Sequence, residues 1–143
     1  MNADERRYKY EDLTRVIIGS FFEVYNELGY GFLESIYKVA MDIALRDQGV
    51  QVEREYALTA HFRGRVVGDF RADLVVNRLV VVELKAVRRL EPAHEAQILN
   101  YLRAGVLEVG LLRNFGPKPQ VRRLTYSNVR KSLTGIPQYL HSC

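Results

Sequence analysis

The chain has 143 residues, of which 48% are hydrophobic and 27% charged, with a net charge of +4 and a pI of about 9.3. This composition is typical of one globular domain and does not favour a disordered chain, and no apolar run approaches the ~20 residues needed to span a membrane. The only cysteine, Cys143, excludes an internal disulfide and suits a reducing compartment, and the charged N-terminus argues against a signal peptide, so we expect a cytoplasmic protein.

The first third of the chain predicts two helices after a polar leader at residues 1–9. Over residues 11–28, apolar side chains recur every three or four positions, which is the spacing of one helix face. Two glycines then end this helix. The same spacing returns over residues 33–44, and Gly49 closes the second helix.

The apolar period then changes to two, which is the alternation of a β-strand. We expect a strand at residues 53–62, a turn at residues 63–65 with a central glycine, and strands at 66–76 and 79–87.

The last third of the chain predicts a helix at residues 91–107 and two short strands at 109–114 and 120–125, followed by a C-terminal tail at 126–143. The resulting order is ααβββαββ. It predicts a single α/β domain over residues 1–143, with a mixed sheet flanked by helices, and not a strictly alternating doubly wound fold.

Residues 80–87 (VVVELKAV) read as a buried strand that two charged residues interrupt. Glu83 and Lys85 are two positions apart, so both side chains lie on the same face of the strand. The preceding strand carries Asp73 on its odd-numbered positions as well. The even-numbered positions of both strands are apolar, so we expect each strand to bury its even face.

The pairing of these two strands follows from that alternation. For the two even faces to coincide, the numbers of paired residues must sum to an even number. A three-residue turn at residues 77–79, which pairs Val76 with Val80, meets this condition. The register then places Asp73 directly opposite Glu83.

Two adjacent carboxylates and a lysine are the groups that metal-assisted hydrolysis of a phosphodiester needs. Neighbouring carboxylates repel each other unless a cation lies between them. Mg²⁺ is bound by one or two carboxylates together with waters and phosphate oxygens. A nearby lysine can orient the attacking water, accept its proton or neutralise charge on the phosphate.

The order of Asp73 and then Glu83-Leu84-Lys85 on adjoining strands resembles the PD-(D/E)XK nuclease superfamily. Ala72 stands where the motif has its proline, a change that removes no ligand. The resemblance implies a restriction-endonuclease-like fold and a metal-dependent nuclease that acts on nucleic acid, with DNA as the expected substrate.

Two further motifs extend the resemblance over residues 13–124. The pattern Gln97-x-x-x-Tyr101 places both side chains on one face of the helix that follows, and it resembles RecB-type nucleases of the same superfamily. Residues 31–37 spell G-x-x-E-x-x-Y. This string resembles a family of small prokaryotic proteins that is named after it and classed with these nucleases.

The resemblance also implies roles for particular residues. The oxygen ligands that it implies for Mg²⁺ or Mn²⁺ come from Asp73, Glu83 and the carbonyl of Leu84, with Glu34 assisting directly or through water. The catalytic set that it implies consists of Lys85, Asp73, Glu83, Gln97 and Tyr101. Lys85 would position or activate the water, and the Gln-Tyr pair would complete the pocket.

Charge is distributed unevenly along the chain. Up to Glu83 there are 11 Lys/Arg and 14 Asp/Glu, a balance of −3, whereas from Leu84 onward there are 10 and 3, a balance of +7. A basic second half fits a polyanionic partner such as nucleic acid. The candidate phosphate contacts, taken as a group, are Arg88, Arg89, Arg103, Arg113, Arg122 and Arg123.

Each of these assignments has a purely structural alternative. Glu34 could be an exposed first-turn acid favoured by the helix dipole, and Lys85 could be a surface lysine whose stem covers apolar surface. Asp73 and Glu83 could be solvated strand charges. Tyr101 could serve packing alone, as could Tyr37 at the end of the G-x-x-E-x-x-Y string.

Two rival functions also stay open. One is a non-catalytic module that binds nucleic acid or protein and retains the nuclease fold. The other is a Mg²⁺-dependent enzyme that acts on a small phosphorylated molecule, which predicts a closed pocket in place of a basic cleft. The small size and an open sheet edge favour a homodimer.

Overall fold

The computed structural model describes residues 10–129, so the expected leader at residues 1–9 and residues 130–143 of the expected tail lie outside the described part. Its elements are α2 (Glu11–Leu28), α3 (Glu34–Asp47), β1 (Val52–Phe62), β2 (Arg65–Val76), β3 (Val80–Lys85), α4 (Pro92–Ala104), β4 (Val109–Phe115) and β5 (Pro119–Thr125). The predicted order ααβββαββ is confirmed. No helix within the described range is long and apolar enough to cross a membrane.

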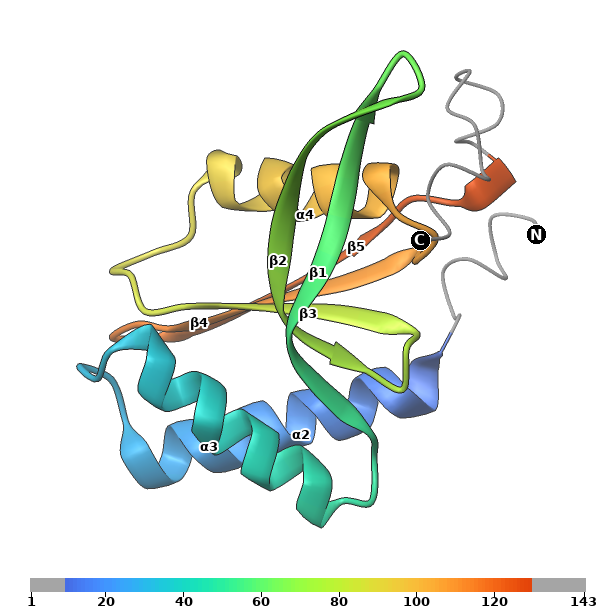
Figure 1. The fold of residues 1–143 in the computed structure, drawn as a ribbon. Helices are drawn as coiled ribbons and strands as arrows, with labels where there is room; N and C mark the ends of the chain where they lie inside the picture. Colours follow the sequence, from blue (N-terminus) through green and yellow to red (C-terminus); the bar gives the residue numbers. More distant parts are fainter. Residues whose placement is uncertain (1–9, 130–143) are drawn as a thin grey trace.

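The five strands form one mixed sheet in the order β1-β2-β3-β4-β5. Only β3 and β4 run parallel, and α4 makes the crossover between them, as parallel neighbours require. Helices α2 and α3 cover one face of the sheet and α4 covers the other (Figure 1). Each interface contains its own cluster of buried apolar side chains.

The turn between β2 and β3 has the predicted length and register. Asn77 and Arg78 adopt positive φ angles of 51° and 55°, and the Leu79 N–H donates to the carbonyl of Val76 over 2.9 Å. Val76 pairs with Val80. The three-residue turn therefore confirms the register that was derived from the alternation of apolar residues.

One prediction about strand faces is wrong. The even residues do not stay on one side of β2, because Leu74 belongs to the cluster under α2 and α3 whereas Ala72 belongs to the cluster under α4. The change coincides with Glu55 on β1, which has a φ of 53°. Glu55 is left out of the ladder, between the pairs Arg54–Leu74 and Tyr56–Ala72. The odd face of the strands is also buried, since Val75 and Val81 pack beneath α4.

The helix after β3 is shorter than its apolar pattern predicted. Its first turn is closed by a capping box, in which the Glu91 N–H donates to Nδ1 of His94 over 2.9 Å. It ends at Ala104, and the N–H of Gly105 donates to the Tyr101 carbonyl over 3.1 Å.

Candidate functional site

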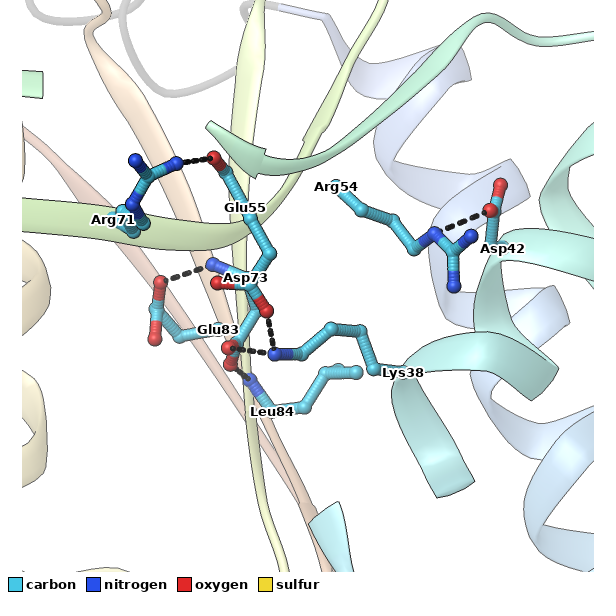
Figure 2. A network of polar contacts seen from close by, with 8 residues as sticks. All are labelled: Lys38, Asp42, Arg54, Glu55, Arg71, Asp73, Glu83 and Leu84. Atoms are coloured by element: carbon cyan, nitrogen blue, oxygen red, sulfur yellow. Dashed lines mark hydrogen bonds and ion pairs between the residues drawn. The ribbon is translucent and has the colours of Figure 1, made fainter. Parts of the chain in front are cut away.

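Asp73 and Glu83 lie on β2 and β3, just beyond the last ladder pair between Leu74 and Val82. Their side chains replace backbone pairing at this point. Glu83 Oε1 accepts the N–H of Asp73 over 2.9 Å, and Asp73 Oδ2 accepts the N–H of Leu84 over 2.9 Å (Figure 2). The two carboxylates are therefore adjacent and each is held in place by a backbone amide of the facing strand.

Glu83 is unusually placed for an acid, because its side chain is only 5% exposed. Burial, and after it the negative charge of Asp73, raises its pKa to about 8. The Asp73 N–H and the charge of Lys85 oppose this rise without cancelling it. At neutral pH the Glu83 carboxyl therefore holds a proton unless a cation binds in its place.

Lys38 on α3 provides a positive charge at this pair. Its Nζ lies 3.2 Å from Asp73 Oδ1 and also donates to Glu55 Oε1, so the ammonium bridges two carboxylates (Figure 2). Burial alone would lower the pKa of Lys38, but the contacts with Glu55 and Asp73 raise it overall. Lys38 therefore stays charged and serves as the resident cation of Asp73.

Lys38 and Glu55 were missed by the sequence analysis. Lys38 is one helical turn after Glu34, which could have indicated a shared helix face. Glu55 stands opposite Asp73, because its neighbours on β1 pair with the neighbours of Asp73 on β2. Neither residue belongs to a motif, and α3 must dock on the sheet before they meet Asp73.

Glu34 is the first residue of α3 and is exposed. Within residues 10–129, no three acidic, histidine or cysteine side chains form a cluster that could hold a metal. Among the described residues Glu34 therefore forms no direct three-acid cluster with Asp73 and Glu83, and its assistance to the metal through water stays a prediction. The position of Glu34 fits the first-turn acid that a helix dipole favours.

Lys85 and the Leu84 backbone complete the strand side of the site. Lys85 is half-buried at the end of β3, and its charge reaches Glu83. The Leu84 side chain is fully buried, and its N–H points toward Asp73. The N–H and C=O of one strand residue face the same neighbouring strand, so the Leu84 carbonyl lies on the Asp73 side as well.

Tyr101 on α4 covers the carboxylate pair from the other side. Its ring is 8% exposed and stacks on Phe70 with 4.5 Å between centroids. Burial, together with the charges of Glu83 and Asp73, raises the pKa of Tyr101 to about 12. Its phenol is therefore a neutral O–H donor at any working pH, while Gln97, one turn earlier on α4, is exposed.

The six candidate arginines do not form a single surface. Arg122 makes an ion pair with Glu95 of α4 at 3.5 Å, whereas Arg123 is adjacent on β5 and therefore faces the opposite side of the sheet. Arg103 lies 6.0 Å from the Tyr126 ring, and Arg88 and Arg89 are exposed just after β3.

Arg113 requires a correction. Its side chain is 1% exposed on β4, a strand that is buried along its whole length, so it cannot contact a phosphate from this position. It donates to the carbonyls of Leu112 and Arg122 over 3.0 and 3.3 Å. Burial lowers its pKa to about 10. Arg113 is thus part of the fold and not of the phosphate-binding surface.

The donor set fits a hard divalent cation. Asp73, Glu83 and the Leu84 carbonyl provide the oxygen ligands that Mg²⁺ and Mn²⁺ prefer, and two carboxylates with waters suffice for Mg²⁺. The ammonium of Lys38 on Asp73 Oδ1 shows that the pair already attracts a cation. Burial and the charge of Asp73 both disfavour the ionised form of Glu83, and a bound cation would favour it.

Comparison with known proteins gives two findings. A family profile described as "PD-(D/E)XK nuclease superfamily" matches residues 11–124. The crystal structure of SSO0001 is similar at a TM-score of 0.55 and 20% identity, over 91% of this chain and 67% of that chain, which shows a common fold. No curated protein matches the sequence. The predicted α/β fold of the restriction-endonuclease-like type is confirmed.

Proposed function

The chain belongs to the PD-(D/E)XK nuclease superfamily, and from this premise we propose that it hydrolyses phosphodiester bonds in nucleic acid, with DNA as the substrate and Mg²⁺ or Mn²⁺ as the cofactor. The observation that carries the proposal is the pairing of Asp73 with Glu83, next to Lys85 on the same strand. A protein that only bound nucleic acid would gain nothing from two adjacent carboxylates near phosphate groups.

Different residues of the chain have different roles in the proposed reaction. Asp73, Glu83 and the Leu84 carbonyl would hold the cation, which supplies Lewis-acid polarisation of a phosphoryl oxygen. Lys85 orients the attacking water and accepts its proton or neutralises the phosphate. The neutral Tyr101 hydroxyl donates a hydrogen bond into the pocket, and Gln97 lies one helical turn away at its exposed margin.

Finer assignments belong to the same proposal. The G-x-x-E-x-x-Y string supports membership of the small prokaryotic family that carries this motif, and Gln97-x-x-x-Tyr101 supports a RecB-type site. The lone Cys143 supports a reducing, cytoplasmic location. A homodimer and a single domain over residues 1–143 remain proposals as well.

The test of this proposal is cleavage of circular and linear DNA and RNA with Mg²⁺, with Mn²⁺ and with EDTA. We expect cutting of DNA that requires the metal and stops in EDTA. If no nucleic acid is cut and calorimetry detects no metal binding, the hydrolase proposal is wrong. The better explanation is then a non-catalytic module that binds nucleic acid or protein and retains the nuclease fold.

A second prediction concerns the resident cation. Lys38→Met should bind Mg²⁺ or Mn²⁺ about tenfold more tightly than the unchanged protein, because the ammonium and the metal compete for Asp73. Two unit charges 4 Å apart interact by ~4 kcal/mol at an effective dielectric of 20. Partial exposure of Lys38 and Asp73 reduces the expected gain to about 1.4 kcal/mol, which is tenfold in Kd.

The measurement is isothermal titration of the metal-free protein with each ion. Arg54→Met is a matched control, because Arg54 also pairs with an acid on α3, Asp42, at 3.0 Å but does not contact Asp73 (Figure 2). Unchanged or weaker metal binding in Lys38→Met would show that Lys38 does not occupy the cation position.

A further inference from the structure

A cleft of about 710 Å³ opens beyond the end of β3. It is lined by Tyr30, Arg88, Arg89, Lys118 and Gln120, together with two prolines of the β4–β5 turn. None of these described lining residues is acidic. Three segments far apart in the sequence meet here, namely the α2–α3 loop, the segment after β3 and the β4–β5 turn, all on the left in Figure 1.

The wall that carries the two arginines is fixed by two side-chain amides, those of Asn114 and Gln120. Asn114 is 0% exposed, accepts the Val87 N–H over 3.0 Å and donates to the Val87 carbonyl over 2.9 Å. Gln120 Oε1 accepts the N–H of Leu90 over 2.8 Å. The backbone is thus anchored on both sides of Arg88 and Arg89.

The approach of this segment to the β4–β5 turn depends on Gly116. A Cβ at this position would lie 2.4 Å from the Val87 carbonyl oxygen and 3.2 Å from that of Arg88. Such distances require the backbone to move, so only glycine allows the two walls to be this close.

Two tyrosine hydroxyls, one from half-buried Tyr25 and one from buried Tyr37, fix the remaining walls. The Tyr25 hydroxyl donates to the Gly116 carbonyl over 2.7 Å, which anchors the β4–β5 turn beside Lys118. The Tyr37 hydroxyl donates to the Gly29 carbonyl over 2.7 Å and accepts the Phe32 N–H over 3.2 Å. Tyr37 therefore holds the loop that carries Tyr30, which gives the last residue of the G-x-x-E-x-x-Y string a structural role.

The cleft is close to the proposed reaction site. Arg88 is three residues after Lys85, so their Cα atoms are at most ~11 Å apart along the chain. A smaller cavity of about 290 Å³ between α2 and α3 is lined by Glu23, Glu27 and Asp47 and would repel a polyanion.

We propose that this cleft binds an unpaired nucleic-acid strand next to the scissile bond, with phosphates at Arg88, Arg89 and Lys118 and a base stacked on Tyr30. The proposal rests on the nuclease function proposed above. Tyr30 is 62% exposed, which is unusual for a large aromatic side chain held beside three cations. Bases in a duplex are already stacked, whereas an unpaired base can stack on an aromatic ring.

The test is fluorescence anisotropy in EDTA, where no hydrolysis takes place, with a labelled 15-nucleotide oligo(dT) and a 15-base-pair duplex as probes. For Arg88→Ala/Arg89→Ala, we expect the slope of log K against log salt to fall by about 1.4, since each lost contact to a single strand contributes ~0.7. Tyr30→Ala should weaken binding by about 5- to 150-fold with the slope unchanged, and Tyr30→Phe should retain affinity, because stacking is worth ~1–3 kcal/mol per base.

Arg65→Ala is the matched control, since Arg65 is an exposed arginine at the tip of the β1–β2 hairpin, far from the cleft (Figure 1). Three results would each overturn the proposal. The first is an unchanged salt slope in the double variant, and the second is equal affinity for the duplex and the single strand. The third is full competition by thymidine monophosphate at micromolar concentration. If the unchanged protein cuts DNA while these variants bind normally, the cleft assignment fails alone. If the strand binds as expected but no metal-dependent cutting occurs, the hydrolase proposal fails alone.

Discussion

Glu83→Ala and Lys85→Ala are each expected to lose metal-dependent cleavage by about 10³-fold or more, which is about 4 kcal/mol of transition-state stabilisation. Glu83→Ala removes one of the two carboxylates that would hold the cation. Lys85→Ala removes the group that handles the proton of the attacking water, an effect worth ~10²–10⁴ in rate by itself. The measurement is the initial rate of cleavage, at saturating Mg²⁺, of whichever DNA substrate the unchanged protein cuts fastest.

Two controls separate chemistry from structure. Glu53 is an acid on β1 that does not contact the Asp73–Glu83 pair and whose Oε1 lies 2.8 Å from Nε of Arg78. The Glu53→Gln variant should therefore cut DNA at the normal rate. Lys85→Arg keeps the charge but not the compact ammonium, so it should recover only part of the activity. Cleavage that persists in both Glu83→Ala and Lys85→Ala would place the activity elsewhere or in a contaminant.

Glu83 should also make the stability of the metal-free protein depend on pH. Its pKa is raised from 4.5 to about 8 in the folded state. The sign follows from linkage, because the folded protein then holds a proton that the unfolded chain releases. The contribution to stability is complete below pH 4.5 and is lost as the pH rises through about 8. Between pH 5.5 and pH 9, the expected loss is about 3 kcal/mol in the free energy of unfolding.

Urea unfolding in EDTA at several pH values measures this loss. Glu83→Gln should flatten the pH dependence and be more stable than the unchanged protein at pH 9, because it buries no charge. Adding Mg²⁺ at pH 9 should stabilise the unchanged protein and leave Glu83→Gln unaffected. Glu53→Gln serves again as the control, and an identical pH slope in Glu83→Gln would contradict the assignment of Glu83 as the buried acid.

The parts of the site that could be predicted from the sequence are those within one hairpin. The parity of the apolar residues determined the pairing of Val76 with Val80, and that register brought Asp73 to Glu83. These contacts are local, so an alternation pattern and a turn length specify them. The order of helices and strands followed from periodicity for the same reason.

The parts that could not be predicted depend on how distant elements pack. Lys38 meets Asp73 only because α3 docks on the face of the sheet. The spacing of apolar residues does not indicate which residue of the sheet a lysine side chain will contact. Arg113 was counted among the phosphate contacts because the second half of the chain is basic, yet β4 is an interior strand of the sheet that is buried along its whole length. Its partners are backbone carbonyls, which leave no pattern in the sequence.

The short separation between the two carboxylates has a consequence for folding kinetics. Asp73 and Glu83 are ten residues apart on one hairpin, and a hairpin forms within ~1–10 μs. The parallel pairing of β3 with β4 must wait for the longer crossover through α4, which closes more slowly. The carboxylate pair is therefore assembled while still in water. Because the charge of Glu83 reaches Tyr101 of α4, we expect the docking of α4 to remove Glu83 from solvent, and the rate of this step should then respond to protons and to divalent cations.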